Sequence, residues 1–268
     1  ATPLLVTLGR PDDGGQLYLD LEAERVVSLV GDQKVARAVS RAMLVELALT
    51  PLAETLEVLV IGDVAPTEVT DLDHVTLIAT WDEVADDLCA WAEQSHDAIA
   101  EKGWPNAFVA RSVEPYHDAL APIVVITDEP LPSKLLHQMR VHPMATLTIV
   151  ANGAVEESTA IDCHPDCLTI VDLGLECTPY LMEPEILEAV IDLVHEAEEL
   201  PGPTTPEGHL PYGPPALLIA QDPHGDDTAI AEPDYDIVVR VLGDIRVEGG
   251  DPLAAKQTAV VAYIALHA

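Results

Sequence analysis

A phosphate-binding motif with altered residues follows the apolar run Arg25–Val30. The residues Gly31-Asp-Gln-Lys-Val-Ala-Arg-Ala38 have the frame G-x-x-x-x-G-K-[ST]. In that frame, glycines let backbone N–H groups surround a phosphate, the lysine reaches the β- and γ-phosphates, and the hydroxyl binds Mg²⁺. Here Ala36 replaces the second glycine, Arg37 the lysine and Ala38 the hydroxyl residue. The spacing indicates a nucleotide site, and the substitutions predict that this site is closed.

A pair of acids follows a later apolar run. Ile123–Thr127 is typical of a buried strand, and Asp128 and Glu129 come directly after it. At the tip of a Walker B strand, the first acid orients Mg²⁺ and its water, and the second can polarise the attacking water. The alternative is that these acids only cap or solvate the end of a strand. Even a true Walker B pair would lack a Mg²⁺ partner, because Ala38 has no side-chain oxygen.

The elements that must position these residues alternate between strand and helix, which favours an α/β fold with a mostly parallel sheet and helices on both faces. The sequence predicts strands at 16–21, 25–30, 56–61, 74–79, 123–127 and 145–150, and helices at 35–49, 81–100, 133–140 and 184–200. Asn152 follows the strand at 145–150. Because the carboxyl ends of parallel strands share one edge, ligand groups are expected there.

The order of these parts resembles the FtsK/HerA-like ATPase domains of the EccC type, over roughly residues 3–198, in a P-loop/RecA-like fold. The resemblance rests on Leu17–Ala23, Gly31–Ala38, Ile123–Glu129 and Thr146–Asn152. It implies that Gly31 and Arg37 hold the P-loop positions, that Asp128 and Glu129 form the Walker B pair, and that Asn152 is a sensor-like strand end.

A cluster of thiols and one imidazole offers a second kind of chemistry. Cys163, His164 and Cys167 lie close together, and Cys177 follows ten residues later. Thiolates and imidazole are zinc ligands, so a structural metal site is one interpretation. The other is a hairpin turning at Pro165-Asp166, with Cys163 and Cys167 as free thiols on neighbouring strands. No catalytic Cys–His spacing is present.

The chain is strongly acidic, with a net charge of −35 at pH 7. Such a surface repels nucleic acid and anionic lipid, so neither is an expected direct partner. The acids are spread along the whole chain, which favours adaptation to a salt-rich cytoplasm; the alternative is an acidic module that shields a basic neighbour. We expect a cytoplasmic excerpt of a longer protein, whose membrane anchors or further domains would lie outside it.

Composition changes after residue 200, and we predict three parts: an α/β domain at 1–200, a Pro/Gly/Asp-rich linker at 201–234, and a further segment at 235–268. In that segment, two short strands with glycine turns precede an apolar helix. The run Val-Arg-Val-Leu-Gly243, the Gly249-Gly250 turn and Lys256-Gln257 resemble the opening of the winged-helix domain in SARP/AfsR-type bacterial regulators. The alternative is a β-β-α extension of the first domain's sheet.

Three functions follow from these patterns. The favoured one is a non-catalytic, P-loop-like regulatory module of a bacterial transcriptional regulator, which binds no cofactor and relays a ligand or partner signal to its own or a partner's winged-helix domain. DNA would be contacted only through regions beyond this chain. The rival is an ATPase or nucleotide switch, in which Lys34 or Arg37 replaces the P-loop lysine and Asp128 with Glu129 handles Mg²⁺. The third is an oligomerisation scaffold.

Overall fold

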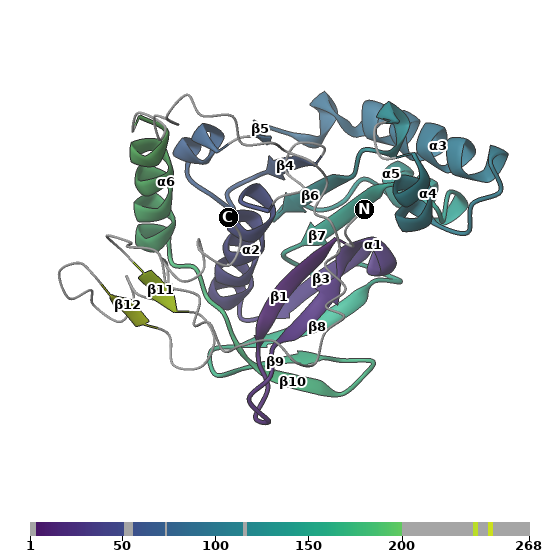
Figure 1. Ribbon diagram of the computed structural model, residues 1–268. Helices are drawn as coiled ribbons and strands as arrows, with labels where there is room; N and C mark the ends of the chain where they lie inside the picture. Colours follow the sequence, from purple (N-terminus) through teal and green to yellow (C-terminus); the bar gives the residue numbers. More distant parts are fainter. Residues whose placement is uncertain are drawn as a thin grey trace, which may run out of the picture. The chain divides into compact units, whose positions relative to one another are not determined.

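The computed structural model describes residues 4–50, 56–72, 74–114, 117–199, 238–240 and 246–248 (Figure 1). The chain divides into two units, Ala1–Glu198 and Glu199–Ala268. In the second unit, β11 (Val238–Arg240) and β12 (Arg246–Glu248) pair as antiparallel strands, as predicted for this segment. The predicted linker at 201–234 and the predicted helix after residue 253 lie outside the described residues.

One sheet of ten strands organises the first unit, in the order β2-β1-β10-β9-β8-β3-β7-β6-β4-β5. From β8 to β5 all neighbours run parallel, whereas from β2 to β8 they run antiparallel. The strands are β1 (Leu5–Arg10), β2 (Leu17–Asp20), β3 (Val26–Gly31), β4 (Glu57–Ile61), β5 (Val75–Ile78), β6 (Ile123–Thr127), β7 (Leu147–Ala151), β8 (Thr159–His164), β9 (Cys167–Ile170) and β10 (Leu175–Pro179). This arrangement confirms the predicted α/β class.

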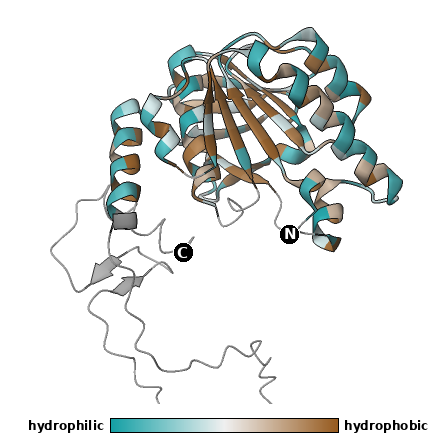
Figure 2. Cartoon of the chain, turned by 90° about the horizontal axis from the view of Figure 1, so that it is seen from above, coloured by the Kyte–Doolittle hydropathy of each residue, from teal (hydrophilic) through white to brown (hydrophobic). Residues whose placement is uncertain are grey.

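Helices cover both faces of the sheet, because its central strands are apolar on both sides. The helices are α1 (Leu21–Glu24), α2 (Gln33–Ala48), α3 (Ala85–Glu101), α4 (Ala107–Val113), α5 (Ser133–Val141) and α6 (Pro184–Glu199), with short 3₁₀ turns at Thr67–Asp71, Trp81–Glu83 and Asp118–Leu120. Figure 2 shows the apolar strands between helices whose outer surfaces are largely hydrophilic.

Alternate residues of each central strand pack on opposite faces of the sheet. In β6, Val124 and Ile126 pack in the cluster that contains α2 and α6, whereas Ile123 and Val125 pack with α3 and α5. All four side chains are at least nine-tenths buried. The chain therefore enters α2 on one face after β3 and α5 on the other face after β6, which places the carboxyl ends of these strands at the ligand-binding edge of such sheets.

Most predicted elements are present, with informative differences. The apolar runs became β3, β4, β6 and β7, and Cys163 and Cys167 lie across a hairpin formed by β8 and β9. The sequence reading missed β1, β10 and α4, and it predicted one helix from residue 81 where a 3₁₀ turn precedes α3. The largest difference for function is that α2 begins at Gln33, two residues before the predicted start.

Candidate functional site: the turn from β3 to α2

The strand β3 and the helix α2 are separated by Asp32 alone. The preceding residue, Gly31, has φ +91°, a backbone conformation that side chains with a Cβ rarely adopt. A Cβ at Gly31 would also lie 2.6 Å from Asp162 Oδ1 and 2.7 Å from the carbonyl oxygen of Cys163. Both constraints explain the glycine through the packing of β3 against β8, without any ligand.

Asp32 is the N-cap of α2 and uses the N–H groups that a phosphate would need. Its Oδ1 accepts hydrogen bonds from the backbone N–H of Lys34 at 2.8 Å and of Val35 at 3.2 Å. The N–H of Asp32 itself donates to the carbonyl oxygen of Cys163 at 2.9 Å. A carboxylate at a helix N-terminus satisfies the same donors and the same dipole as a phosphate. The Asp32 carboxylate therefore occupies the position at which the motif would bind a nucleotide phosphate.

The alanines of the altered motif belong to the core. Ala36 is fully buried and packs in the cluster that contains the central strands, and Ala38 is 2% exposed. The carbonyl oxygen of Ala36 accepts from Ser40 Oγ at 3.0 Å, and that of Ala38 accepts from the N–H of Met182 at 3.0 Å. A larger hydroxyl residue at Ala38 would have to displace packed neighbours.

Arg37, at the lysine position of the motif, binds the first acid of the Walker B pattern. Its Nη2 lies 2.6 Å from Asp128 Oδ2, and the Asp128 side chain is 9% exposed. The second oxygen of Asp128 accepts from the N–H of Asp63 at 2.9 Å. Both carboxylate oxygens are thus occupied by protein donors. The structure brings Arg37 and Asp128, the residues at the P-loop lysine and Walker B positions, together as an ion pair.

Glycine is required at the end of β4 for this arrangement. Gly62 has φ +87°, and a Cβ there would lie 2.1 Å from Asp128 Oδ1. The close approach of the backbone lets the N–H of Asp63 reach the carboxylate. Neither Gly62 nor Asp63 was singled out by the sequence reading, because their contact with Asp128 depends on the parallel pairing of β4 with β6.

The other predicted site residues have different surroundings. Asn152 follows β7, which lies between β3 and β6, and its side-chain oxygen accepts a hydrogen bond from Ser40 Oγ. Glu129 is half-buried, and its N–H donates to Thr127 Oγ1 at 3.0 Å. Lys34 is exposed on the first turn of α2. Asn152 thus joins α2 to the sheet, and Lys34 is an exposed cation beside the turn.

Positive charge on α2 balances acids around this edge. Burial lowers the pKa of Arg41, and the neighbouring Arg37 guanidinium lowers it further, while Glu183 and Asp63 raise it. Arg41 Nε donates to the carbonyl oxygen of Val64 at 2.8 Å. The arginines on α2 are therefore engaged with the ends of neighbouring strands, which stabilises the edge in the absence of any ligand.

The cysteines that the sequence offers as zinc ligands lie in the antiparallel half of the sheet. Burial raises the pKa of Cys163 to about 12 and that of Cys177 to about 11, which disfavours the thiolates that bind metal. Cys89, Cys163, Cys167 and Cys177 are all free thiols. Among the described residues, one group of three potential ligand atoms lies within 4.8 Å, and it contains none of these cysteines.

Small hollows in the described surface lie away from this turn. One of about 100 Å³ is lined by residues of α1, α4 and the segment before β7, and one of about 70 Å³ by residues around Arg25, α5 and Glu156. Neither is lined by residues 31–38 or 128–129.

Among the described helices, none is long and apolar enough to cross a membrane.

Solved structures similar to this chain include two ATPase proteins and one protein bound to an ATP analogue. The chain is similar to the pCW3 conjugation coupling protein TcpA with ATPγS, at 11% identity and a TM-score of 0.53, covering 72% of this chain and 71% of that one. It is similar to Thermomonospora curvata EccC (ATPases 2 and 3) in complex with a signal sequence peptide, at 14% identity and a TM-score of 0.54, covering 73% and 47%. It is also similar to EssC (ATPases 2 and 3) from Geobacillus thermodenitrificans, at 14% identity and a TM-score of 0.54, covering 75% and 50%.

These likenesses support the predicted α/β, P-loop/RecA-like fold, which this chain shares with those structures. The chain spans about half the length of the EccC and EssC structures. No family model matches the chain, and no curated protein was found to match it. At identities of 11% and 14%, these likenesses show a shared fold and not a shared activity. The chemistry of this chain depends on its own residues at the site.

Proposed function

We propose that this chain is a non-hydrolysing domain with an FtsK/HerA-like fold, which acts through contact with protein partners instead of through ATP turnover. The observation that carries the proposal is the Arg37–Asp128 ion pair, at 2.6 Å, between the two positions that would bind triphosphate and Mg²⁺. The Asp32 cap supports it, since it occupies the N–H groups of Lys34 and Val35. Binding nucleotide would require both sets of contacts to break.

We further propose a role in transcriptional regulation. It rests on the resemblance of residues 235–268 to the opening of a SARP/AfsR-type winged-helix domain, and the antiparallel pairing of β11 with β12 is compatible with it. The partners would be this winged-helix domain, a corresponding domain of another chain, or a second copy of the chain. With a net charge of −35, this chain should not bind duplex DNA even at low salt. Fluorescence anisotropy with labelled duplex DNA checks this, and saturable binding would contradict it.

A nucleotide-binding ATPase is the second candidate, and the fold likeness favours it. All three similar structures described above are named as ATPases or hold an ATP analogue. In this candidate, Arg37 would leave Asp128 and turn to the phosphates, Lys34 would supply a second cation, and Asp128 with Glu129 would hold Mg²⁺. Arg37 is 38% exposed, so its side chain can reach solvent.

Calorimetry with Mg-ATP and a phosphate-release assay on the same preparation separate the candidates. The proposed function predicts no saturable heat and no phosphate release above a blank without protein. Asp128→Ala is the matched variant, because it removes the Walker B acid and leaves Arg37 free to bind a phosphate group. If the wild-type chain binds Mg-ATP and Asp128→Ala abolishes turnover, the ATPase candidate is correct and the proposal is wrong.

A further inference from the structure

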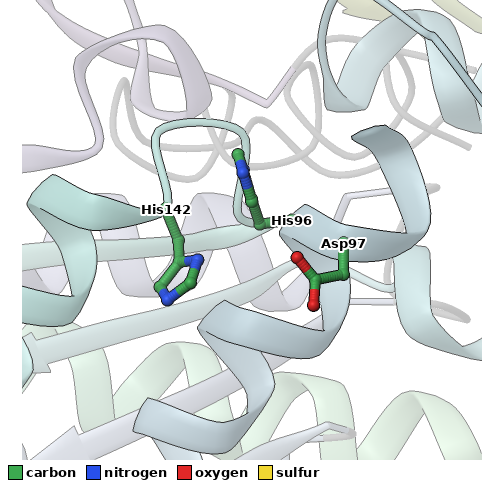
Figure 3. Close-up of side chains that lie close together, drawn as sticks. All are labelled: His96, Asp97 and His142. Atoms are coloured by element: carbon green, nitrogen blue, oxygen red, sulfur yellow. The ribbon is translucent and has the colours of Figure 1, made fainter. Parts of the chain in front are cut away.

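A pair of histidines and an acid converge on the edge of the sheet opposite to the nucleotide motif. His96 and Asp97 belong to the last turns of α3, and His142 is the C-cap of α5, shortly before β7 begins. One ligand atom from each of the three lies within 4.8 Å of the others (Figure 3). Among the described residues, this is the group whose potential metal-ligand atoms converge. The sequence reading did not find it, because its members come from separate elements.

We propose that His96, Asp97 and His142 bind a first-row divalent metal ion, with Zn²⁺ as the ion of choice. Two imidazoles and one carboxylate suit Zn²⁺ and its neighbours, whereas Ca²⁺ and Mg²⁺ prefer ligand sets made of oxygen. In a tetrahedral zinc site the ligand atoms lie about 3.4 Å apart, which follows from metal–ligand distances near 2.1 Å. Small side-chain rotations would close the observed spacing. Three protein ligands leave a fourth position for water.

A buried nitrogen of the group supports a ligand independently of the spacing. His142 Nδ1 is buried, and among the described residues it has no hydrogen-bond partner. A buried polar atom without a partner is unfavourable, and coordination to a metal ion would satisfy it. The rings of His96 and His142 lie 5.2 Å apart between centroids at an angle of 62°, so they meet edge to face and do not stack. Metal binding would therefore not need to separate stacked rings.

The backbone around the group is already held in place. The N–H of Thr146 donates to Ser95 Oγ at 3.2 Å, and the N–H of Met144 donates to His96 Nδ1 at 3.3 Å. Arg25 Nη2 donates to the carbonyl oxygen of His142 at 3.0 Å. The segment after α5 is thus attached to α3 before any ion binds. Sites on such supported elements lose little freedom when they take up a ligand.

Metal binding would change one of these contacts in a predictable way. In a neutral imidazole bound to metal, the nitrogen away from the metal carries the proton. If the ion binds His96 Nδ1, it replaces the N–H of Met144; if it binds Nε2, Nδ1 becomes a donor. In both cases the hydrogen bond from Met144 ends. The amide of Met144 therefore reports on the site, and the ion would link α3 directly to the residue that ends α5.

Calorimetry with ZnCl₂ on the intact chain, in a large excess of Mg²⁺ to suppress diffuse binding by the acidic surface, tests the proposal. We expect binding of one ion, weakened at least about tenfold by His142→Ala and by Asp97→Asn, since each removes a ligand. Asp97 is exposed, so Asp97→Asn should fold normally. His137→Ala is the matched control, because His137 lies exposed on α5 outside the group and its loss should leave binding unchanged.

Two further measurements distinguish this site from zinc binding by the cysteine cluster at Cys163, His164, Cys167 and Cys177. The double variant Cys163→Ser with His164→Ala should bind as wild type, and the Co²⁺ complex should lack a sulfur-to-metal charge-transfer band. In addition, the Met144 amide should lose protection from hydrogen exchange when Zn²⁺ is added. No saturable binding, binding that survives both His142→Ala and Asp97→Asn, or a sulfur band would each overturn the proposal.

Discussion

Removal of the Asp128 carboxylate separates a structural ion pair from a catalytic one. In the structure Asp128 accepts from Arg37 and from the N–H of Asp63, and its side chain is 9% exposed. Hydrogen bonds to charged groups contribute about 1.5–3 kcal/mol each, and we take the lower end for Arg37 because its side chain is 38% exposed. The two contacts together give about 3–4.5 kcal/mol, so Asp128→Ala should lower the free energy of unfolding by about that amount.

The pair itself is isolated by a double-mutant cycle. Arg37→Ala alone should cost about 1–2 kcal/mol, and the double variant should cost about 1 kcal/mol less than the sum of the two single variants. Urea unfolding at low and at high salt measures these values, because screening of the net charge of −35 changes overall stability.

A working site gives the opposite result for Asp128. Acids that are held for catalysis are commonly strained, so their removal leaves stability unchanged or raises it. If Asp128→Ala is as stable as wild type or more stable, the ion pair does not close the site, and the reasoning fails. A coupling energy near zero would equally contradict the pair.

Three further predictions follow from single residues. Asp32→Ala should lower the free energy of unfolding by about 1 kcal/mol through loss of the α2 N-cap; urea unfolding at an unchanged m-value checks this, and no change would argue against the cap. Gly62→Ala should cost about 2 kcal/mol or more, because its φ is +87° and the new Cβ would meet Asp128; a neutral effect in thermal unfolding would refute the close approach. Burial raises the pKa of Cys163 from 9.0 to about 12, so its buried neutral thiol favours the folded state, and this contribution is complete below pH 9 and lost as pH rises toward 12. Cys163→Ser should reduce the fall in stability between pH 9 and 11, and an identical pH profile for the variant would contradict the shift.

The central strands and the residues at their carboxyl ends were predictable from the sequence, because strands buried on both faces are continuous apolar runs. β3 and β6 are buried on both faces, so they are uninterrupted apolar runs, and parallel neighbours bring Gly31, Asp128 and Asn152 to one edge. The start of α2 could also have been found: Asp32 before Gln-Lys-Val is a strong N-cap signal, but the phosphate-loop frame favoured a loop through residue 34.

Other parts depend on contacts that no local pattern carries. β1 and β10 lie in the antiparallel half, where exposed residues such as Leu175 and Glu176 dilute the alternation that marks a strand. The contact of Gly62 with Asp128 depends on the register of β4 against β6. The convergence of His96 with His142 depends on how α3 packs against α5. Spacing along the chain gives no signal for any of these.

The backbone amides of the β3–α2 turn give the most direct test of the closed site. Two-dimensional ¹H–¹⁵N spectra of the labelled chain would be recorded during a titration with Mg²⁺ and ATPγS. We expect the resonances of the Asp32, Lys34 and Val35 amides to stay at their initial positions, because Cys163 and the Asp32 carboxylate already accept their hydrogen bonds. Saturable shifts of these amides, as a bound phosphate would cause, would contradict this expectation.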